Sequence, residues 1–319
     1  MSRLFPLSAL LLAGSLSLLA DVDLPLLNLA PAGTRVLFGA NVTEARLSPF
    51  GQFVLAHFNA ATNDDSGFQN FVLETGFDPR QDVQSLIVAS SGNKGGSQNV
   101  VIVRALFDQT KFEATAEDKG DTIQNYQGVD MILFKNAKLG HNGQTSQGAV
   151  AFLTSDIFVA GDSATVMQII ANRAVPTSLD PTLLNQVQKV GASNSLWFVS
   201  IVPGTDFLTR MAPDADQMQR GQILQSVVAS SGGVELGQQI SLSFDAIARS
   251  AQDATSLGDV IHFGASLAQM QSDKDPKAAA LSNALTNMVV SVNGSSVHVA
   301  MTLPEQALEQ LAASMPHHQ

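Results

Sequence analysis

The side chains best suited to act as general bases or metal ligands are six histidines, and their spacing favours neither role. They are His57, His141, His262, His298, His317 and His318. No two of the first four have the helical or turn spacing of a zinc site. His57 and His262 fall on apolar faces of expected helices, and His298 falls in an expected hairpin strand, opposite Asn293 and on the solvent side. We therefore predict no metal site.

Motifs for nucleophilic catalysis and phosphate binding are missing from the sequence. There is no G-x-S-x-G turn, no G-x-x-x-x-G-K-[ST] loop and no G-x-G-x-x-G turn. The repeated Ser-Ser-Gly runs at 90–92 and 230–232 are interpreted as hairpin loops, because small polar residues suit turns. The paired acids at 64–65 and at 214 and 216 lack the further oxygen ligands of a calcium loop. The sequence thus predicts no catalytic residue, no cofactor-binding residue and no cofactor.

One group of charged residues remains as a candidate surface, in the run LETGFDPRQDV. It consists of Glu74, Asp78, Arg80 and Asp82. Paired carboxylates beside apolar residues could serve glycoside or peptide hydrolysis. In the alternative interpretation, which we favour, Asp78 caps the segment that begins at Pro79, and Arg80 pairs with Asp82 on the surface.

The composition indicates a folded, acidic protein. Hydrophobic residues make up 45% and charged residues 14% of the chain, which is typical of a buried core rather than of disorder. The net charge is −11 and no cluster of Lys and Arg occurs. Phosphate backbones and anionic lipids would repel such a surface, so nucleic acid is excluded as a partner. The chain has no cysteine, which excludes a lipid-modified cysteine after an export signal.

The amino-terminal segment predicts export. Arg3 is followed by an apolar run from Leu4 to Ala20, which ends at Asp21. A short basic region, an apolar core and a small residue before a polar stretch are typical of a secretory signal. Cleavage after Ala20 would place the protein in the periplasm or outside the cell. Leu18 stands at the −3 position, where a small residue is usual, so an uncleaved inner-membrane anchor is the alternative. A membrane is a partner only in that alternative.

Turn and capping residues divide the rest of the chain into short elements. Residues 21–33 are expected to be an extended lead-in, and residues 136–147 and 230–233 to be loops. Asn-Gly at 293–294 is a strong hairpin signal. Strands are expected at 34–42, 85–89, 100–107, 123–126, 129–134, 149–153, 157–160, 195–202, 223–229, 239–248, 288–292 and 297–301. Helices are expected to begin at Ser48, Asp108, Asp162, Asp180, Ser250 or Asp253, Asp275 and Pro304.

The two halves of the chain repeat the same order of elements. QSLIVASSG at 84–92 resembles QSVVASSG at 225–232, and a nearly constant offset of about 140 residues also places the segment 149–171 on 288–311. This predicts an α+β fold of two duplicated units, each an antiparallel sheet with helices packed on one face. The expected division is a signal at 1–20, a lead-in at 21–33, repeats at 34–178 and 179–316, and a tail at 317–319. The two sheets could join edge to edge or form separate lobes.

Several segments together resemble an uncharacterised family of exported bacterial proteins of acidobacterial type. In the first half these are Ser48–Gly51, Thr75–Asp82 and Val101–Asp108, and in the second half they are Trp197 and Gly233–Ile240. The resemblance covers most of the first half. It implies export, and it assigns no activity and no catalytic residue.

The function expected from the sequence is therefore binding rather than catalysis. We expect an exported, non-enzymatic protein that binds a protein or a cell-envelope component. Two alternatives stay open. One is a carrier of a small apolar ligand held between sheet and helices, which requires a sizeable apolar pocket. The other is a hydrolase that uses the acids near Glu74–Asp82.

Overall fold

A computed structural model describes residues 22–62, 65–92, 99–139, 146–175, 178–204, 225–237, 239–271, 285 and 287–304. The predicted signal at 1–20, the helix expected after Asp275, the helix expected after Pro304 and the tail at 317–319 lie outside these residues. No helix within the described ranges is both long enough and apolar enough to cross a membrane.

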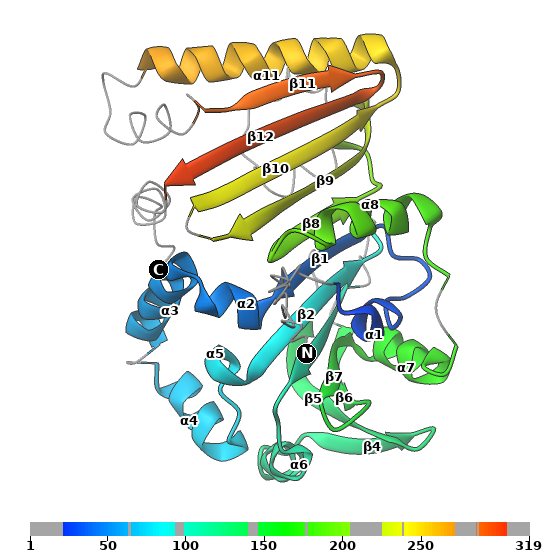
Figure 1. Ribbon diagram of the computed structural model, residues 1–319. Helices are drawn as coiled ribbons and strands as arrows, with labels where there is room; N and C mark the ends of the chain where they lie inside the picture. The colour runs from blue at the N-terminus through cyan, green and yellow to red at the C-terminus, as the bar shows by residue number, and fades with distance from the viewer. Residues whose placement is uncertain are drawn as a thin grey trace, which may run out of the picture.

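The described residues form mostly short helices and one large sheet (Figure 1). The helices are α1 (Leu24–Leu27), α2 (Val42–Leu47), α3 (Pro49–Thr62), α4 (Ser66–Thr75), α5 (Pro79–Asp82), α6 (Gln109–Asp118), α7 (Ser163–Asn172), α8 (Pro181–Gly191) and α11 (Ala251–Gln271). The strands are β1 (Val36–Asn41), β2 (Val83–Ser90), β3 (Asn99–Ala105), β4 (Thr122–Tyr126), β5 (Val129–Leu139), β6 (Ser146–Phe152), β7 (Ile157–Asp162), β8 (Leu196–Ser200), β9 (Val227–Leu236), β10 (Gln239–Ala248), β11 (Val289–Asn293) and β12 (Ser296–Pro304).

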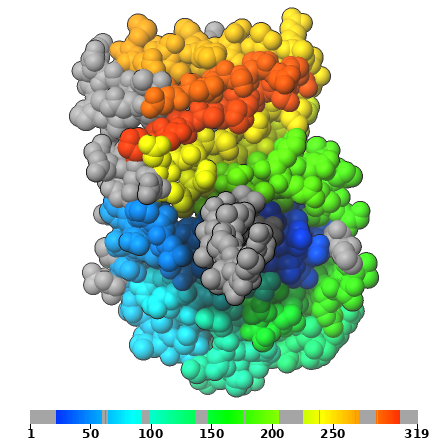
Figure 2. Space-filling view, in the orientation of Figure 1, coloured from blue at the N-terminus to red at the C-terminus, as the bar shows by residue number. Residues whose placement is uncertain are grey.

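All twelve strands belong to a single antiparallel sheet, in the order β11-β12-β10-β9-β8-β1-β2-β3-β7-β6-β5-β4. The predicted α+β class is confirmed, and the open question of edge-to-edge joining is decided by the pairing of β1 with β8. In the space-filling view the described residues of β9, β10, β11, β12 and α11 occupy one end of the molecule, and those of β2 to β7 lie toward the other (Figure 2).

The strand order reads the same outwards from the β1–β8 pair in both directions. One direction gives β1-β2-β3-β7-β6, and the other gives β8-β9-β10-β12-β11. The first half adds the hairpin β4–β5 at its outer edge. A helix follows the third strand in each direction, namely α6 after β3 and α11 after β10.

Helices cover both faces of the sheet, whereas the sequence predicts helices on one face only. Neighbouring residues of a strand point to opposite faces. On one face, Ile102 packs in a core that includes buried residues of α1, α7 and α8. We call this the α7/α8 face. On the other, Val103 packs in a cluster with Phe77 and Phe112 beneath α4 and α6. Phe244 of β10 packs in the cluster that contains buried residues of α11, and its ring lies beside that of Phe198 on this second face. Helix α11 therefore covers the same face, which we call the α6/α11 face.

The capping residues act as the sequence predicts. The side chains of Asp108, Asp162 and Asp180 each accept a hydrogen bond from a backbone N–H in the first turn of α6, α7 and α8. A carboxylate at this position satisfies one of the unpaired N–H groups of a helix and interacts favourably with the positive end of its dipole. Ser48 accepts from Gly51 N–H at the start of α3, and α11 begins at Ala251, where Ser250 accepts from Asp253 N–H.

Two local expectations are wrong. Residues 24–27 of the expected extended lead-in form the single helical turn α1, because Asp23 accepts a hydrogen bond from Leu26 N–H and Leu26 and Leu27 are buried. The expected loop 230–233 lies inside β9, where all four residues are buried. Small residues are needed there, because a Cβ at Gly232 would lie 2.7 Å from a ring carbon of Phe198 and one at Gly233 would overlap Asn194.

The expected loop at 136–147 is partly strand. Residues 136–139 continue β5, and Ser146 and Gln147 begin β6, while residues 140–145 lie outside the described residues. The two strands pair again beyond an irregularity, with Lys138 opposite Gln147.

Candidate functional site

The predicted candidate surface at 74–82 is a turn held together by its own charges. Asp78 is buried, caps α5 as predicted, and accepts hydrogen bonds from Arg80 Nε and Arg80 Nη2, both at 2.8 Å. The Arg80 guanidinium holds the pKa of Asp78 below its ordinary value, although burial acts in the opposite direction. The predicted pair of Arg80 with Asp82 is wrong, because Asp82 Oδ2 instead accepts from the backbone N–H of Asp78 at 2.7 Å.

Glu74 belongs to α4 rather than to this turn and forms an ion pair with Lys119 Nζ at 2.5 Å. The four residues are therefore not gathered around one cleft, and none of them lines the pockets described below. Asp78 and Asp82 both have structural partners in the turn. This geometry gives the carboxylates a stabilising role, and the hydrolytic role stays a hypothesis without a described cleft around it.

One pocket lies on the α6/α11 face, between the sheet and helices α4 and α6. Its volume is about 240 Å³. Six phenylalanines line it, and they come from α4, α6, the loop before α5 and three strands: Phe71, Phe77, Phe112, Phe134, Phe152 and Phe158. Ring centroids of Phe77 and Phe112 lie 5.5 Å apart, and those of Phe112 and Phe152 lie 5.6 Å apart. We call this the phenylalanine pocket.

Polar groups are few in the phenylalanine pocket, and three of them have partners. Thr75 Oγ1 donates to the carbonyl of Phe71 at 2.6 Å, and Lys119 forms the ion pair with Glu74. Asp121 accepts from the backbone N–H of Lys135. A molecule in this pocket would meet mainly ring edges and aliphatic carbon. The sequence analysis missed the site, and the only signal for it was the excess of Phe, 17 residues against one Tyr and one Trp.

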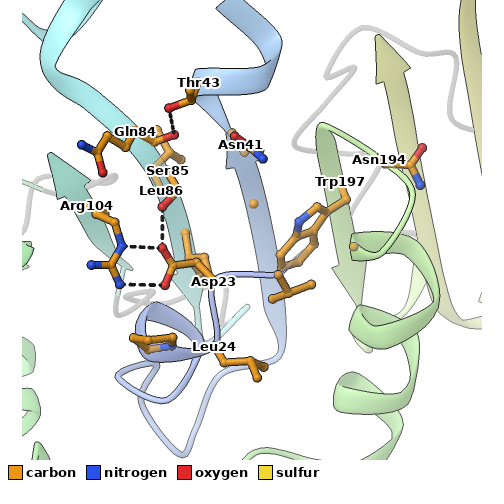
Figure 3. Close-up of a pocket in the computed structure, with 16 residues that line it drawn as sticks. Asp23, Leu24, Asn41, Thr43, Gln84, Ser85, Leu86, Arg104, Asn194 and Trp197 are labelled. Carbon is orange, nitrogen blue, oxygen red and sulfur yellow. Dashed lines mark hydrogen bonds and ion pairs between the residues drawn. The ribbon is translucent and has the colours of Figure 1, made fainter. Parts of the chain in front are cut away.

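Another pocket lies on the α7/α8 face, between α1 and the end of α8, with a volume of about 420 Å³ (Figure 3). One wall carries an ion pair. Arg104 donates from Nε to Asp23 Oδ2 at 2.7 Å and from Nη2 to Asp23 Oδ1 at 3.1 Å. Ser85 Oγ also donates to Asp23 Oδ2, and Arg104 Nη1 contacts Asp156. We call this the Asp23 pocket.

The electrostatics of this wall favour the charged forms of both partners. Burial raises the pKa of Asp23, but the hydrogen bonds from Arg104 and Ser85 and the positive charge of Arg104 outweigh it, and the net pKa is below the ordinary value. The hydrogen bond to Asp23 is the main reason that the pKa of Arg104 is raised. The ion pair therefore stays charged at neutral pH and fixes α1 to β2 and β3.

The opposite wall of the Asp23 pocket is formed by the single tryptophan. Trp197 of β8 is 7% exposed and its ring lies over Gly39 of β1, where a Cβ would overlap it. Asn194 stands beside it, with its Nδ2 donating to the carbonyl of Val190 at 2.7 Å. Asn41 of β1 lies between the two walls (Figure 3) and caps α2 by accepting from Glu44 N–H.

A His–Asp pair lies on the α7/α8 face of the second half of the chain. His298 Nδ1 is 2.9 Å from Asp245 Oδ1, and both side chains are partly exposed. The residue opposite His298 on β11 is Ser291, not Asn293 as expected, because the hairpin turns through residues 294 and 295. Acyl transfer also needs N–H donors aimed at an oxyanion. Strand β12, which carries His298, lies between β10 and β11, so its backbone pairs with a strand on each side. The pair therefore has no described oxyanion site beside it.

No group of three or more metal-binding side chains comes together within the described ranges.

Comparison with known proteins gives a fold and no family. No protein-family model matches the chain, and no curated protein matches it. The structure of crystal form III of TP0453 aligns with a TM-score of 0.54 and 8% sequence identity, over 91% of this chain and 98% of that chain. The structure of crystal form IV of TP0453 aligns with a TM-score of 0.53 and 8% identity, over 90% of this chain and 96% of that chain. At this level of identity the likeness concerns the fold alone: the chain is similar to TP0453 in its mixed α+β architecture.

Proposed function

We propose that the protein is an exported binding protein whose ligand is a small apolar molecule held in the phenylalanine pocket. The observation that carries the proposal is the lining of this pocket, in which six aromatic rings surround about 240 Å³ of space. The volume is slightly below the range of about 300–1,000 Å³ usual for drug-sized ligands. The ligand is accordingly a compact one, such as a single aromatic ring system or a short acyl segment.

The chemistry of the lining selects against polar ligands. Because the hydroxyl of Thr75 and the ammonium of Lys119 already have partners, a polar ligand would lose its hydrogen bonds to water and gain few in return. Such an uncompensated loss costs roughly 1–3 kcal/mol for each group in proteins. An apolar ligand has no hydrogen bonds to water to lose on entry, and it contacts ring edges of Phe77, Phe112 and Phe152.

Filling the pocket from α6 is expected to abolish binding. Ala116 is buried, lines the pocket and packs against Ile132 and Phe152. In the variant Ala116→Phe the added ring would occupy the space of the ligand. Because the ring enters an existing void, the free energy of unfolding is expected to change by about 1 kcal/mol or less. The measurement is a fluorescence titration with naphthalene, a single fused ring system, and at least a tenfold loss of affinity is expected.

The matched control is Phe263→Ala on α11, a residue that is 69% exposed and distant from the pocket in the fold. It removes an aromatic ring that could bind the probe non-specifically, and it should leave the affinity unchanged. A folded Ala116→Phe protein that binds the probe as tightly as the wild type would refute the proposal.

A second candidate function is the binding of a protein of the cell envelope. It is favoured by a row of exposed apolar side chains on α11, which are Val260, Phe263, Leu267 and Met270. Their spacing places them along one stripe of the helix. Pull-down from an envelope fraction should recover a partner with the wild type and lose it with Phe263→Ser/Met270→Ser. Equal recovery by both proteins would argue against this surface.

Export is part of the proposal and rests on the amino-terminal sequence. Cleavage after Ala20 would leave Asp23 and α1 in the mature chain, with Asp23 still bound to Arg104. Amino-terminal sequencing of the protein from the periplasm should begin at Asp21. An intact Met1 in the membrane fraction would instead support the anchored alternative.

We also infer that the chain arose by duplication of one α+β unit. The inference is supported by the identical strand order on the two sides of the β1–β8 pair. The offset of 140 residues carries Asn99, the start of β3, onto Gln239, the start of β10, and carries β7 onto β12. The phenylalanine pocket lies in the first unit only, since it involves β5, which is part of the added hairpin β4–β5.

A further inference from the structure

We propose that the Asp23 pocket is a second binding site, for a neutral, hydroxyl-rich ligand of monosaccharide or disaccharide size. Its volume of about 420 Å³ is within the usual range for small-molecule sites. It lies on the opposite face of the sheet from the phenylalanine pocket, so this proposal does not depend on the function proposed above.

The charges of the pocket select for a neutral ligand. The carboxylate of Asp23 accepts hydrogen bonds from Arg104, from Ser85 Oγ and from the backbone N–H of Leu26. The third guanidinium nitrogen of Arg104, Nη1, contacts Asp156. Each charge on this wall therefore has a partner of opposite sign. A charged ligand would have to displace one of these partners, whereas a neutral ligand would not.

The uncharged polar groups of the pocket have unused hydrogen-bonding capacity. Asn41 uses its Oδ1 to cap α2, which leaves its Nδ2 donors available. Asn194 uses its Nδ2 to bond Val190, which leaves its Oδ1 as an acceptor. In the described part of the chain, the indole N–H of Trp197 and the side-chain amide of Gln84 bond to no other group. The pocket thus offers both donors and acceptors without charge.

Trp197 gives the clearest indication of a ligand. The residue as a whole is 93% buried, but its indole nitrogen is not one of the fully buried side-chain atoms that lack a partner, so the N–H faces the open space of the pocket, where a ligand can accept from it. A hydroxyl group can accept from Trp197 and Asn41 and can donate to Asn194, so a polyol meets all three groups with one kind of functional group.

The remaining walls suit the carbon framework of a sugar. Val22, Leu24 and Pro25 form an apolar side next to Asp23. Figure 3 shows the Asp23–Arg104 pair on one wall, Trp197 on the facing wall and Asn41 between them. A sugar ring has a hydroxyl rim and a face of C–H groups, and both find matching surfaces here.

The fluorescence of Trp197 provides a specific measurement, because it is the only tryptophan of the chain and it lines the pocket. The purified protein would be titrated with glucose, N-acetylglucosamine and maltose, and isothermal calorimetry would give the affinity independently. A saturable change in emission is expected with at least one of these sugars. Glutamate and glucose 6-phosphate, which are charged, are expected to give none.

The variant Asn41→Asp separates binding from stability. An aspartate keeps the oxygen that caps α2 and removes the Nδ2 donors, so the fold should be retained while the affinity falls about tenfold. Gln84→Ala should weaken binding in the same direction. The matched control, Gln239→Ala at the exposed start of β10, should bind as the wild type does.

Three results would overturn the proposal. They are the absence of a saturable response to every neutral sugar, unchanged affinity in a folded Asn41→Asp/Gln84→Ala protein, and tighter binding of the charged ligands. Ala116→Phe should leave sugar binding intact. Its effect on the apolar probe therefore tests the phenylalanine pocket separately.

Discussion

Replacing Phe77 with alanine is expected to lower the free energy of unfolding by about 3–5 kcal/mol, the usual cost of removing a buried aromatic ring. Phe77 is 5% exposed, and its ring centroid lies 5.5 Å from that of Phe112, 5.9 Å from Phe158 and 6.3 Å from Phe71. The change removes hydrophobic burial and also three aromatic contacts that join α4, α6 and β7. The measurement is urea unfolding followed by circular dichroism.

The slope of the urea transition should stay the same, because it reflects the surface exposed on unfolding rather than the stability. Phe263→Ala serves again as the matched control and should change the free energy of unfolding by about 0.5 kcal/mol or less. If Phe77→Ala costs no more than this control, the aromatic cluster is not a stabilising core and the pocket that it surrounds is not preformed.

The second large effect is expected for Asp23→Asn, which should lower the free energy of unfolding by about 2 kcal/mol near neutral pH. Removing one partner of a buried ion pair costs roughly 3–5 kcal/mol. The side chains of Asp23 and Arg104 are 16% and 23% exposed, so solvent screening reduces this figure. Arg104 also keeps its contact with Asp156 in the variant.

The same residue should make stability depend on acid. The pKa of Asp23 in the folded protein is below its ordinary value of 3.8. Its ionisation therefore contributes stability above this ordinary value, and the contribution is lost as the pH falls through the lowered pKa of the folded state. Asp23→Asn should show a flatter loss of stability in this acidic range than the wild type.

The measurement is urea unfolding at neutral pH and at several acidic values around and below 3.8. Asp118→Asn, which changes an exposed acid at the end of α6, is the control and should match the wild type in both respects. The double variant Asp23→Asn/Arg104→Met should regain part of the stability, because it removes the cation left with one partner fewer. A wild-type acid profile in Asp23→Asn would show that the ion pair contributes no net stability.

Local sequence signals predicted most helix and strand positions because the forces behind them act over a few residues. Asp108, Asp162 and Asp180 begin helices through hydrogen bonds to N–H groups within the next turn. The hairpin predicted from Asn-Gly at 293–294 joins β11 and β12, but Asn293 is the last residue of β11, and the two turn residues are Gly294, with a positive φ of 56°, and Ser295. The cap of α5 by Asp78 was predicted for the same reason, whereas Arg80 pairs with Asp78 and not with Asp82 as predicted.

Predictions failed where tertiary contacts override local preference. The run Ser230–Gly233 has the composition of a loop, but it forms a strand because β8 and β10 pair with it on both sides and Phe198 and Asn194 leave room only for small residues. The segment before β1 contains two prolines, at 25 and 31, and was expected to be extended. Its helical turn exists because Asp23 is fixed by Arg104, which is 81 residues away in the chain.

By itself the sequence determined the α+β class, the acidic and cysteine-free composition, and the cap of α5 by Asp78, since each depends on residue type or on neighbours in the chain. Only the tertiary structure decided that the two halves join through β1 and β8 into one sheet. It also decided both pockets, because Phe71 and Phe158, or Asp23 and Trp197, meet only when distant strands and helices pack together. No pattern of neighbouring residues encodes such a meeting, so the sites that we propose could not be predicted from local spacing.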